Sequence, residues 1–396
     1  MLTRVLAVLV LGFTGAPPAA AATLSWTRPV KVSRSVALAG VTCQSPSLCV
    51  AFGDAGRVFV SSEPSGGAVT WKVRHIDGSA RLEVVSCPSE SLCAAYDGGG
   101  NVLVSTHPLQ GASTWRRIAS DPGLDSFTCP SRSLCVGVDS TGNVISSTHP
   151  ARAGSWRTQT AGDRSPTYEC VHDQDPGECA LMSLSDLSCP SPRICTALDQ
   201  AGNVVLSTDP HSRDWLVAYA EPPDTASGLT AISCTSAHFC FGTDGWGNFL
   251  ASADPAGGRS AWSATGLHTA GGQNGPDASL GHMITGAVCS SSSACIATNR
   301  ETRLFATANP AGTAPAWRPT GLDAVNSMTC PGHGWCFASE VDGSIRSTDD
   351  PGRPHSWTRA FDDHVLSGVP GRFACLSKKL CVAVDPLGRV ATGTVR

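Results

Sequence analysis

The chain has 396 residues, of which 15% are charged, and its formal net charge is −4 at pH 7. Because a nucleic-acid backbone requires a basic surface, this balance argues against nucleic acid as a partner. No linker, low-complexity tract or long charge run divides the chain.

The first 22 residues have the pattern of a cleavable secretory signal. Arg4 precedes an apolar stretch over residues 5–13, and small residues follow at 19–22. The apolar stretch is too short to span a bilayer stably, and no later segment is long enough to do so. We therefore expect residues 1–22 to be a signal peptide and the mature protein to be secreted, without a membrane span.

Eight times along the chain, two cysteines bracket five residues. The pairs are Cys43/Cys49, Cys87/Cys93, Cys129/Cys135, Cys189/Cys195, Cys234/Cys240, Cys289/Cys295, Cys330/Cys336 and Cys375/Cys381. Successive pairs start 41 to 60 residues apart. This period is typical of stacked or ringed supersecondary units.

Each unit contains short apolar runs bounded by Gly, Pro, Asp and Ser. One unit has a run at Leu92–Tyr96, a turn at Asp97–Gly100, a run at Asn101–Ser105 and a further run that begins at Trp115. Four runs per unit predict four antiparallel strands joined by hairpins, which is the signature of a β-propeller blade. The predicted fold is all-β, a single propeller of eight four-stranded blades, with seven blades as the alternative.

One Trp recurs in each unit, and its position predicts how the ring closes. The eight are Trp26, Trp71, Trp115, Trp156, Trp215, Trp262, Trp317 and Trp357. Trp26 precedes the first cysteine pair, and no Trp follows the last. We expect the N-terminal strand near residues 24–32 to complete the blade begun at Cys375, which removes exposed sheet edges. One propeller domain over 23–396 results, with the repeated Trp side chains between neighbouring blades. Trp335 stands at a repeated apolar position and is expected in the core.

Export favours disulfides for all 18 cysteines. A ninth pair, Cys170 and Cys179, lies in an insertion. Zinc binding is the competing interpretation, but Cys-x5-Cys repeated without matching His is poor zinc spacing. Each repeat bridge closes a loop of about seven residues, for which the chain-entropy model gives about 2 kcal/mol.

An Asp recurs four residues after the second Cys, followed three residues later by Gly. These are Asp97, Asp139, Asp199, Asp244 and Asp385. Repeated carboxylates suggest catalysis or metal binding. A structural role explains them better, because Asp opens a turn by accepting backbone N–H groups two residues on and Gly takes the positive-φ position.

A second motif lies between the third and fourth expected strands. It reads Ser207-Thr-Asp209-Pro210, Ser252-Ala-Asp254-Pro and Ser347-Thr-Asp349-Asp-Pro, each before a Trp. It resembles the Asp-box turn, Ser-x-Asp-x-Gly-x-x-Trp, of sialidase-like β-propellers. In that family the Asp-box is a folding element away from the active site, so the resemblance implies the fold without the activity. His107 and His149 replace Asp in two repeats and are expected to be turn residues rather than general bases.

Two links between blades are much longer than the others, at about 158–186 and 263–286, and function is expected where the repeat breaks. The candidate binding residues are Tyr168, His172, Asp173 and Asp175 in the first insertion and His282 in the second. The carboxylates could serve as Ca²⁺ ligands, but they lack EF-hand spacing. Solvated loop carboxylates are favoured, and we predict no cofactor.

Trp246 is the remaining candidate for a binding residue. It occupies the turn Asp244-Gly-Trp246-Gly247, where other repeats carry small or polar residues or Pro386. An exposed aromatic ring there can stack on a sugar or anchor a partner. The alternative is that the ring folds onto a neighbouring loop.

An enzyme needs a constellation that the sequence does not supply. A sialidase-like hydrolase requires an Arg cluster, a Tyr–Glu pair and an acid/base Asp, and no other hydrolase or phosphate-binding motif is present. The leading hypothesis is a secreted, monomeric binding module for an extracellular glycan or protein. The first alternative is a glycoside hydrolase or lyase that uses Asp173, Glu178 and Arg164, and the second is an envelope scaffold without a small ligand.

Overall fold

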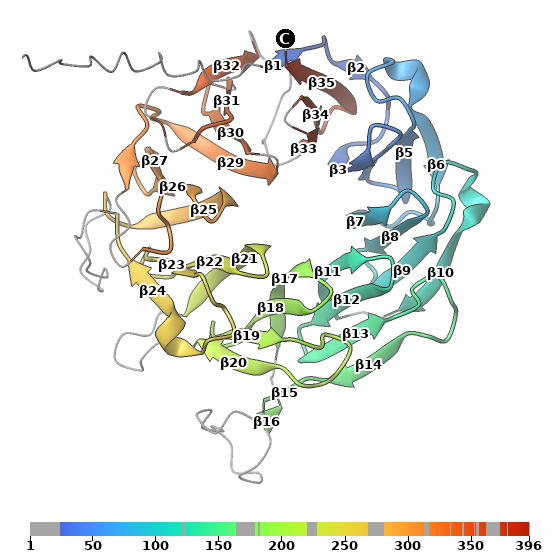
Figure 1. The fold of residues 1–396 in the computed structure, drawn as a ribbon. Helices are drawn as coiled ribbons and strands as arrows, with labels where there is room; N and C mark the ends of the chain where they lie inside the picture. The colour runs from blue at the N-terminus through green and yellow to red at the C-terminus, as the bar shows by residue number, and fades with distance from the viewer. Residues whose placement is uncertain are drawn as a thin grey trace, which may run out of the picture.

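A computed structural model shows a ring of antiparallel sheets (Figure 1). The structure describes residues 24–120, 123–163, 179–180, 183–219, 228–267, 281–312, 317–332, 334–342, 344–351, 353, 356–361, 373–377 and 379–395. Eight sheets form blades around a central axis, which confirms the eight-bladed prediction; the seven-bladed alternative is wrong.

The blades are numbered in chain order, and in blades 1 to 7 the four strands pair consecutively. Blade 1 contains β3 (Leu38–Ser45), β4 (Leu48–Gly53), β5 (Arg57–Ser61) and β6 (Lys72–His75). Blade 2 contains β7 (Leu82–Ser89), β8 (Leu92–Asp97), β9 (Asn101–Ser105) and β10 (Trp115–Ser120). Blade 3 contains β11 (Leu124–Ser131), β12 (Leu134–Asp139), β13 (Asn143–Ser147) and β14 (Arg157–Thr160). Blade 4 contains β17 (Leu184–Ser191), β18 (Ile194–Asp199), β19 (Val204–Ser207) and β20 (Leu216–Tyr219).

The second half of the ring repeats this order. Blade 5 contains β21 (Leu229–Ser236), β22 (Phe239–Asp244), β23 (Phe249–Ser252) and β24 (Trp262–Thr265). Blade 6 contains β25 (Ile284–Ser291), β26 (Ala294–Asn299), β27 (Leu304–Thr307) and β28 (Arg318–Pro319). Blade 7 contains β29 (Val325–Gly332), β30 (Trp335–Glu340), β31 (Ile345–Thr348) and β32 (Thr358–Phe361). Single 3₁₀ turns, η1 (Ala68–Thr70), η2 (Ala112–Thr114) and η4 (Arg259–Ala261), precede three of the outer strands.

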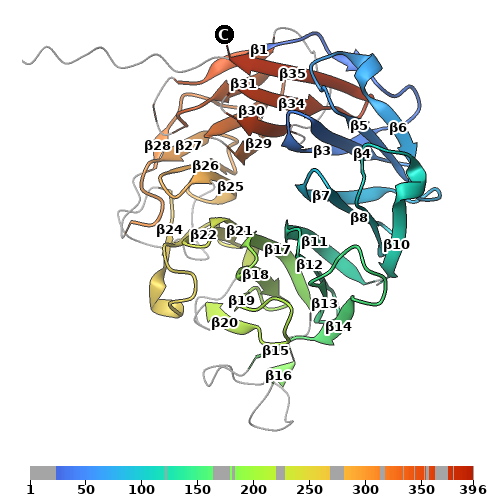
Figure 2. The ribbon, with the colours of Figure 1, turned by 45° about the vertical axis from the view of Figure 1, so that its right-hand side comes forward.

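Blade 8 joins the two ends of the chain. Its strands β33 (Phe373–Ser377), β34 (Leu380–Val384) and β35 (Arg389–Val395) are completed by β1 (Leu24–Trp26), with β2 (Val30–Lys31) also paired to β35. Trp26 lies opposite Gly393, where a Cβ atom would lie 2.7 Å from the indole ring. The Trp26 ring also packs edge-on against Phe337 of blade 7 and Phe373 of blade 8, with 6.0 Å between the ring centroids in each pair. Closure by the N-terminal strand is visible in Figures 1 and 2, and the prediction is confirmed.

The second strand of a blade is covered on both faces by neighbouring blades. In β8 every residue is buried, as it is in β4, β12, β18 and β22. Burial on both faces explains why these segments read as continuous apolar runs without a polar alternation.

Each of the eight core clusters combines a blade's repeat Trp with that blade's disulfide. In blade 4, Trp215 is fully buried and clusters with Cys195 and with Val136 of blade 3. The predicted position of the Trp side chains between blades is confirmed. Trp335 is also fully buried, as expected.

Eight disulfides join the first strand of each blade to the second, with Cα–Cα distances of 4.0 or 4.1 Å. They are Cys43–Cys49, Cys87–Cys93, Cys129–Cys135, Cys189–Cys195, Cys234–Cys240, Cys289–Cys295, Cys330–Cys336 and Cys375–Cys381. The predicted bridge is therefore present in every blade, and eight bridges indicate an oxidising, extracellular environment. Cys170 lies outside the described residues, so its pairing with Cys179 stays a prediction.

The second cysteine of each bridge is fully buried, one residue after the start of the second strand. These are Cys49, Cys93, Cys135, Cys195, Cys240, Cys295, Cys336 and Cys381. A side chain without exposed surface cannot contact a partner. These eight cysteines are therefore structural parts of the core and are not part of a binding surface.

A Ser caps the bridged hairpin at its tip. In blade 3, Ser131 Oγ accepts the N–H of Ser133 at 3.2 Å. Ser45, Ser191, Ser236, Ser291 and Ser377 accept the equivalent bond in other blades. The hydroxyl thus supplies an acceptor for a turn N–H that the strand ladder leaves without one.

The repeated Asp builds the turn after the second strand. Asp139 Oδ1 accepts the N–H groups of Thr141 at 2.9 Å and Asn143 at 2.7 Å, and Oδ2 accepts Asn143 Nδ2 at 2.8 Å. Gly142 has φ 82°. The same Asp–Asn pairing recurs at Asp97/Asn101, Asp199/Asn203 and Asp244/Asn248. The structural interpretation of these carboxylates is confirmed.

A Ser or Thr hydroxyl holds the hairpin between the third and fourth strands. Ser105 Oγ accepts the N–H of His107, and Ser147 Oγ accepts that of His149, each at 3.1 Å. The same bond uses Ser61, Ser207, Ser252, Thr307 and Thr348 in other blades. In blade 7 the motif therefore begins at Thr348, one residue later than the sequence suggested.

Candidate functional site

The candidate binding residues of the first insertion lie outside the described residues. These are Tyr168, His172, Asp173 and Asp175. Only the stem of that insertion is described, a two-stranded sheet of β15 (Gly162–Asp163) and β16 (Cys179–Ala180). It projects outward from the ring beyond blades 3 and 4 (Figures 1 and 2). Binding by the insertion stays a prediction.

The two other candidates lie on neighbouring segments. Trp246 is half-buried in the β22–β23 turn, where its backbone N–H donates to Asp244 Oδ1 at 3.0 Å. The N–H of Ile284 donates to the carbonyl of Gly247 at 2.9 Å, which brings the segment of His282 beside this turn. His282 is also half-buried. The structure thus brings these two segments together on one edge of blades 5 and 6.

One carboxyl pair has perturbed pKa values, but it does not form an open acid–base site. A hydrogen bond from Asp97 is the main cause that lowers the pKa of Asp77, and Arg117 assists at 3.0 Å. Burial raises the pKa of Asp97, whose side chain is fully buried and bonded to Asn101. Among the described residues, no group of three His, Cys, Asp or Glu is placed to hold a metal ion.

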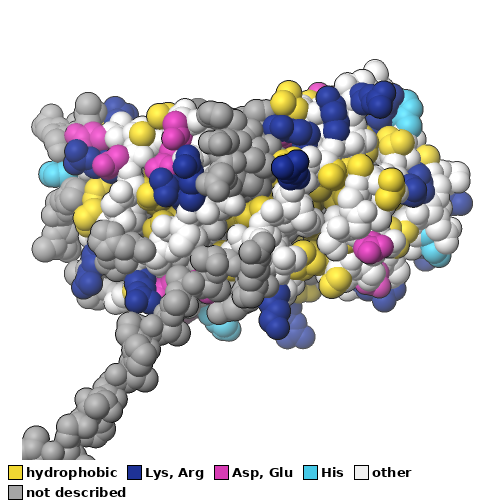
Figure 3. Space-filling model, turned by 90° about the horizontal axis from the view of Figure 1, so that it is seen from above, with side chains coloured by type: hydrophobic (Ala, Val, Ile, Leu, Met, Phe, Trp, Pro, Cys, Tyr) yellow, Lys and Arg dark blue, Asp and Glu magenta, His cyan; other side chains and the backbone are white. Residues whose placement is uncertain are grey.

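The side of the outer rim that Figure 3 shows does not present one broad apolar face over its described residues. In the view of Figure 3, hydrophobic side chains are interspersed with charged ones of both signs. Large apolar side chains that are exposed in the described part of the chain are Val69, Val73, Leu109, Leu216, Val341 and Leu387. No helix in that part is long and apolar enough to cross a membrane.

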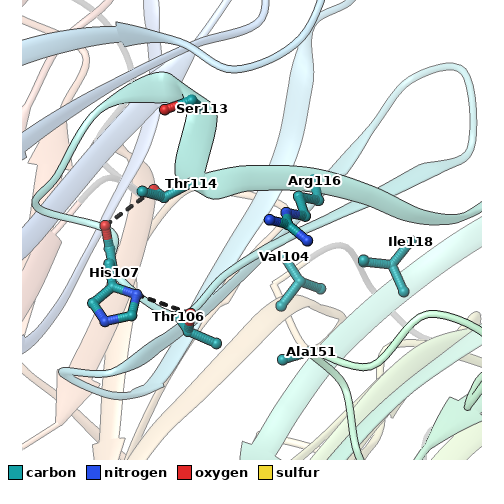
Figure 4. Close-up of a pocket in the computed structure, with 8 residues that line it drawn as sticks. All are labelled: Val104, Thr106, His107, Ser113, Thr114, Arg116, Ile118 and Ala151. Carbon is teal, nitrogen blue, oxygen red and sulfur yellow. Dashed lines mark hydrogen bonds between the residues drawn. The ribbon is translucent and has the colours of Figure 1, made fainter.

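A cationic groove lies between blades 2 and 3. It consists of two adjoining hollows, of about 340 Å³ and about 440 Å³, which share Thr106 and Ala151. The first is lined by Val104, Thr106, His107, Ser113, Thr114, Arg116, Ile118 and Ala151 (Figure 4). The second is lined by Ser91, Leu92, Thr106, Arg132, Ser133, Thr148, His149, Pro150, Ala151 and Arg152. Neither hollow has an acidic side chain in its described lining.

Three guanidinium groups are available in this groove. Arg116 comes from β10, Arg132 from the disulfide hairpin of blade 3, and Arg152 from the β13–β14 hairpin. All three side chains are exposed, and none forms a hydrogen bond or ion pair with the described part of the chain. In a chain whose net charge is −4, this groove gathers positive charge that no acidic side chain of the described residues neutralises.

Two histidines add polar atoms in fixed positions. His107 Nδ1 lies 3.0 Å from Thr106 Oγ1, and His149 Nδ1 lies 3.2 Å from Thr148 Oγ1. Their backbone N–H groups are capped by Ser as described above. The expected role as turn residues fits this geometry, and both rings also line the groove.

A small residue occupies one hairpin position at the groove. The position follows the hairpin Pro and is Ala151 in blade 3. At the junction of blades 3 and 4 the equivalent residue is His211, whose ring nitrogen Nδ1 bonds Ser146 Oγ of blade 3 and whose backbone carbonyl accepts Gln159 Nε2. At the junction of blades 1 and 2, Arg74 donates to the carbonyls of Leu109 and Gln110 in the equivalent hairpin.

Sequence reasoning missed this groove because its residues follow the repeat and do not break it. The available signal was the residue after the hairpin Pro, which varies while its neighbours are repeated. It is Ser65, Leu109, Ala151, His211, Ala256 and Ala311 in blades 1 to 6.

No family model matches the sequence, and no curated protein matches it. Among solved structures, the chain is similar to YCF48 from Cyanidioschyzon merolae, with 16% identity over 93% of this chain and 98% of that one and a TM-score of 0.50. It is also similar to YCF48 bound to D1 peptide, with 11% identity, 95% and 100% coverage and a TM-score of 0.54. BamB from Moraxella catarrhalis gives 9% identity, 94% and 99% coverage and a TM-score of 0.56. These similarities show the propeller fold alone.

Proposed function

We propose that the chain is a secreted binding module that recognises an extracellular protein partner through the cationic groove between blades 2 and 3. The observation that carries this proposal is a groove that holds three guanidinium groups without a partner among the described residues, beside the apolar floor of its first hollow. Arg pairs with carboxylates through two parallel hydrogen bonds, which gives geometric specificity as well as attraction. The protein acts as a monomer in this account.

The lining favours an extended acidic peptide. Val104, Ile118 and Ala151 form an apolar floor in the first hollow, while Arg132 and Arg152 flank the second. A segment that carries Asp or Glu beside a small apolar residue would satisfy both features. In a solved structure with the same fold, YCF48 is bound to D1 peptide, so a propeller of this type accommodates a peptide.

An extracellular glycan is the second candidate. Sugar rings are bound by stacking on Trp, Tyr or Phe side chains, and the described lining of the groove has none of these. A glycan would instead use Trp246, as predicted from the sequence. Binding to a glycan array that is lost in Trp246→Ala would favour this candidate over the groove.

Selection of peptides on the purified, oxidised protein tests the proposed function. A displayed random-peptide library should yield peptides enriched in Asp and Glu, and Arg116→Glu or Arg152→Glu should raise their Kd by about tenfold or more. Arg193→Glu is the matched control, because Arg193 is an exposed residue of the blade 4 disulfide hairpin outside the groove. Selected peptides without acidic enrichment, or equal losses in the control, would contradict the proposal.

A further inference from the structure

A separate hollow, outside the cationic groove, lies between blades 4 and 5. Its position is equivalent to that of the first hollow of the groove. Its volume is about 470 Å³. The strand register fixes the equivalence, since Leu216 pairs with Leu206 in blade 4 as Arg116 pairs with Val104 in blade 2. The hairpin position that is Ala151 in the groove is Ala256 here. This hollow is named the acidic hollow below.

The chemistry of the acidic hollow is opposite to that of the groove. Asp209 stands where the groove has His107, and Leu216 stands where it has Arg116. Asp214 also lines the hollow, and Ala218 extends its apolar wall. The two positions therefore share one backbone geometry and differ in charge.

Leu216 is the unusual residue of this hollow. It is 47% exposed on the outer strand. The equivalent residues on other outer strands include the cations Lys72, Arg116, Arg157 and Arg318. An exposed Leu at a position that holds a cation in four other blades, beside carboxylates, provides an apolar contact within an anionic mouth.

We infer that the acidic hollow is a second recognition site, which binds a segment of a partner protein that carries an apolar side chain flanked by Lys or Arg. Charge complementarity selects this occupant, because Asp209 offers a carboxylate to a cation while Leu216 packs against the apolar residue. The site is separate from the cationic groove and goes beyond the proposed function. With both sites, one propeller would hold two segments of opposite charge.

Reciprocal variants test this inference, because each hollow supplies the control for the other. The probes are two fluorescein-labelled peptides, one of alternating Lys and Leu and one of alternating Glu and Leu, titrated with the protein by fluorescence anisotropy. Asp209→His combined with Leu216→Arg gives blade 4 the residues of blade 2. This double variant should raise the Kd of the Lys–Leu peptide by about tenfold or more.

A plugging variant provides an independent readout. Ala256→His introduces the residue that His211 supplies at the junction of blades 3 and 4, where the fold accommodates it. It should abolish binding of the Lys–Leu peptide, whereas Ala151→His should leave that binding unchanged. The thermal unfolding midpoint of each variant checks that the fold is intact.

The outcomes separate the two proposals. If the Lys–Leu peptide does not bind, or binds equally to Ala256→His, the acidic hollow is not a recognition site, although Glu–Leu binding that is lost in Ala151→His would still support the groove. If Lys–Leu binding depends on Ala256 while Glu–Leu binding is absent, the inference stands and the proposed function fails.

Discussion

His211 Nδ1 of blade 4 lies 2.8 Å from Ser146 Oγ of blade 3, and the carbonyl of His211 accepts Gln159 Nε2 at 2.8 Å. This contact closes the junction of blades 3 and 4 at the position where Ala151 and Ala256 leave the junctions on either side open. At this junction the His211 ring fills the hairpin position that is Ala151 or Ala256 beside the hollows. The pattern of sealed and open junctions gives an otherwise repetitive ring distinct sites.

The burial of His211 also predicts a pH dependence of stability. Burial lowers the pKa of His211, Arg157 lowers it further, and Asp209 opposes the shift. The folded state therefore disfavours protonation relative to the unfolded chain. Stability from this residue is present above about pH 6.5, the ordinary histidine value, and is lost as pH falls below it, because the unfolded state then binds the extra proton.

Unfolding by guanidinium at several pH values measures this effect. The free energy of unfolding should fall less between pH 7.5 and 5.5, roughly the histidine range, in His211→Gln than in the unmodified protein. Identical slopes in the two proteins would refute the assigned role.

Each disulfide is expected to stabilise its blade by constraining the unfolded chain. Replacing both Cys87 and Cys93 with Ala should lower the free energy of unfolding by about 2 kcal/mol from loop entropy, with a further loss because Cys93 is fully buried. Equilibrium unfolding in denaturant measures the difference. A double variant as stable as the parent would show that the bridge constrains nothing.

Each repeat Trp side chain should contribute more to the free energy of unfolding than Trp246 does. Trp215 is fully buried between blades 3 and 4, so Trp215→Ala should cost about 3–5 kcal/mol. Trp246 is half-buried in a turn, and Trp246→Ala should cost clearly less. Comparison of the two unfolding free energies checks this order, and equal losses would be inconsistent with it.

Removal of a turn carboxylate tests the structural account of the repeated Asp. Asp139→Ala leaves the N–H groups of Thr141 and Asn143 without their acceptor, which should cost about 1–3 kcal/mol. Binding of the selected acidic peptides should not change, because the turn is not part of the groove. A loss of binding with no loss of stability would indicate a functional carboxylate instead.

Most of the fold was predictable because each blade repeats the same local chemistry. The Cys-x5-Cys pairs, the Asp turns and Trp26 were sufficient to predict eight blades and their closure by β1. The predicted start of the hairpin motif in blade 7, Ser347, was wrong by one residue. Ser347 and Thr348 both offer a hydroxyl, and only the strand register selects Thr348.

The candidate site was not predictable in the same way. Ala151, His211 and Leu109 occupy one position in the sequence repeat, yet whether each junction is open depends on what the side chain meets across the neighbouring blade. The Arg side chains of the groove come from one strand and two hairpins that are separate in the sequence, so no local spacing reveals their convergence. Sequence reasoning therefore favoured the insertions, where the repeat visibly breaks.

The most direct test of the central claim is the Kd of library-selected acidic peptides for Ala151→His, compared with Ala256→His as the matched control. The account predicts that Ala151→His plugs the cationic groove and abolishes binding, while Ala256→His binds as the unmodified protein does. Undiminished binding to a folded Ala151→His variant would contradict the claim that the groove between blades 2 and 3 is the binding site.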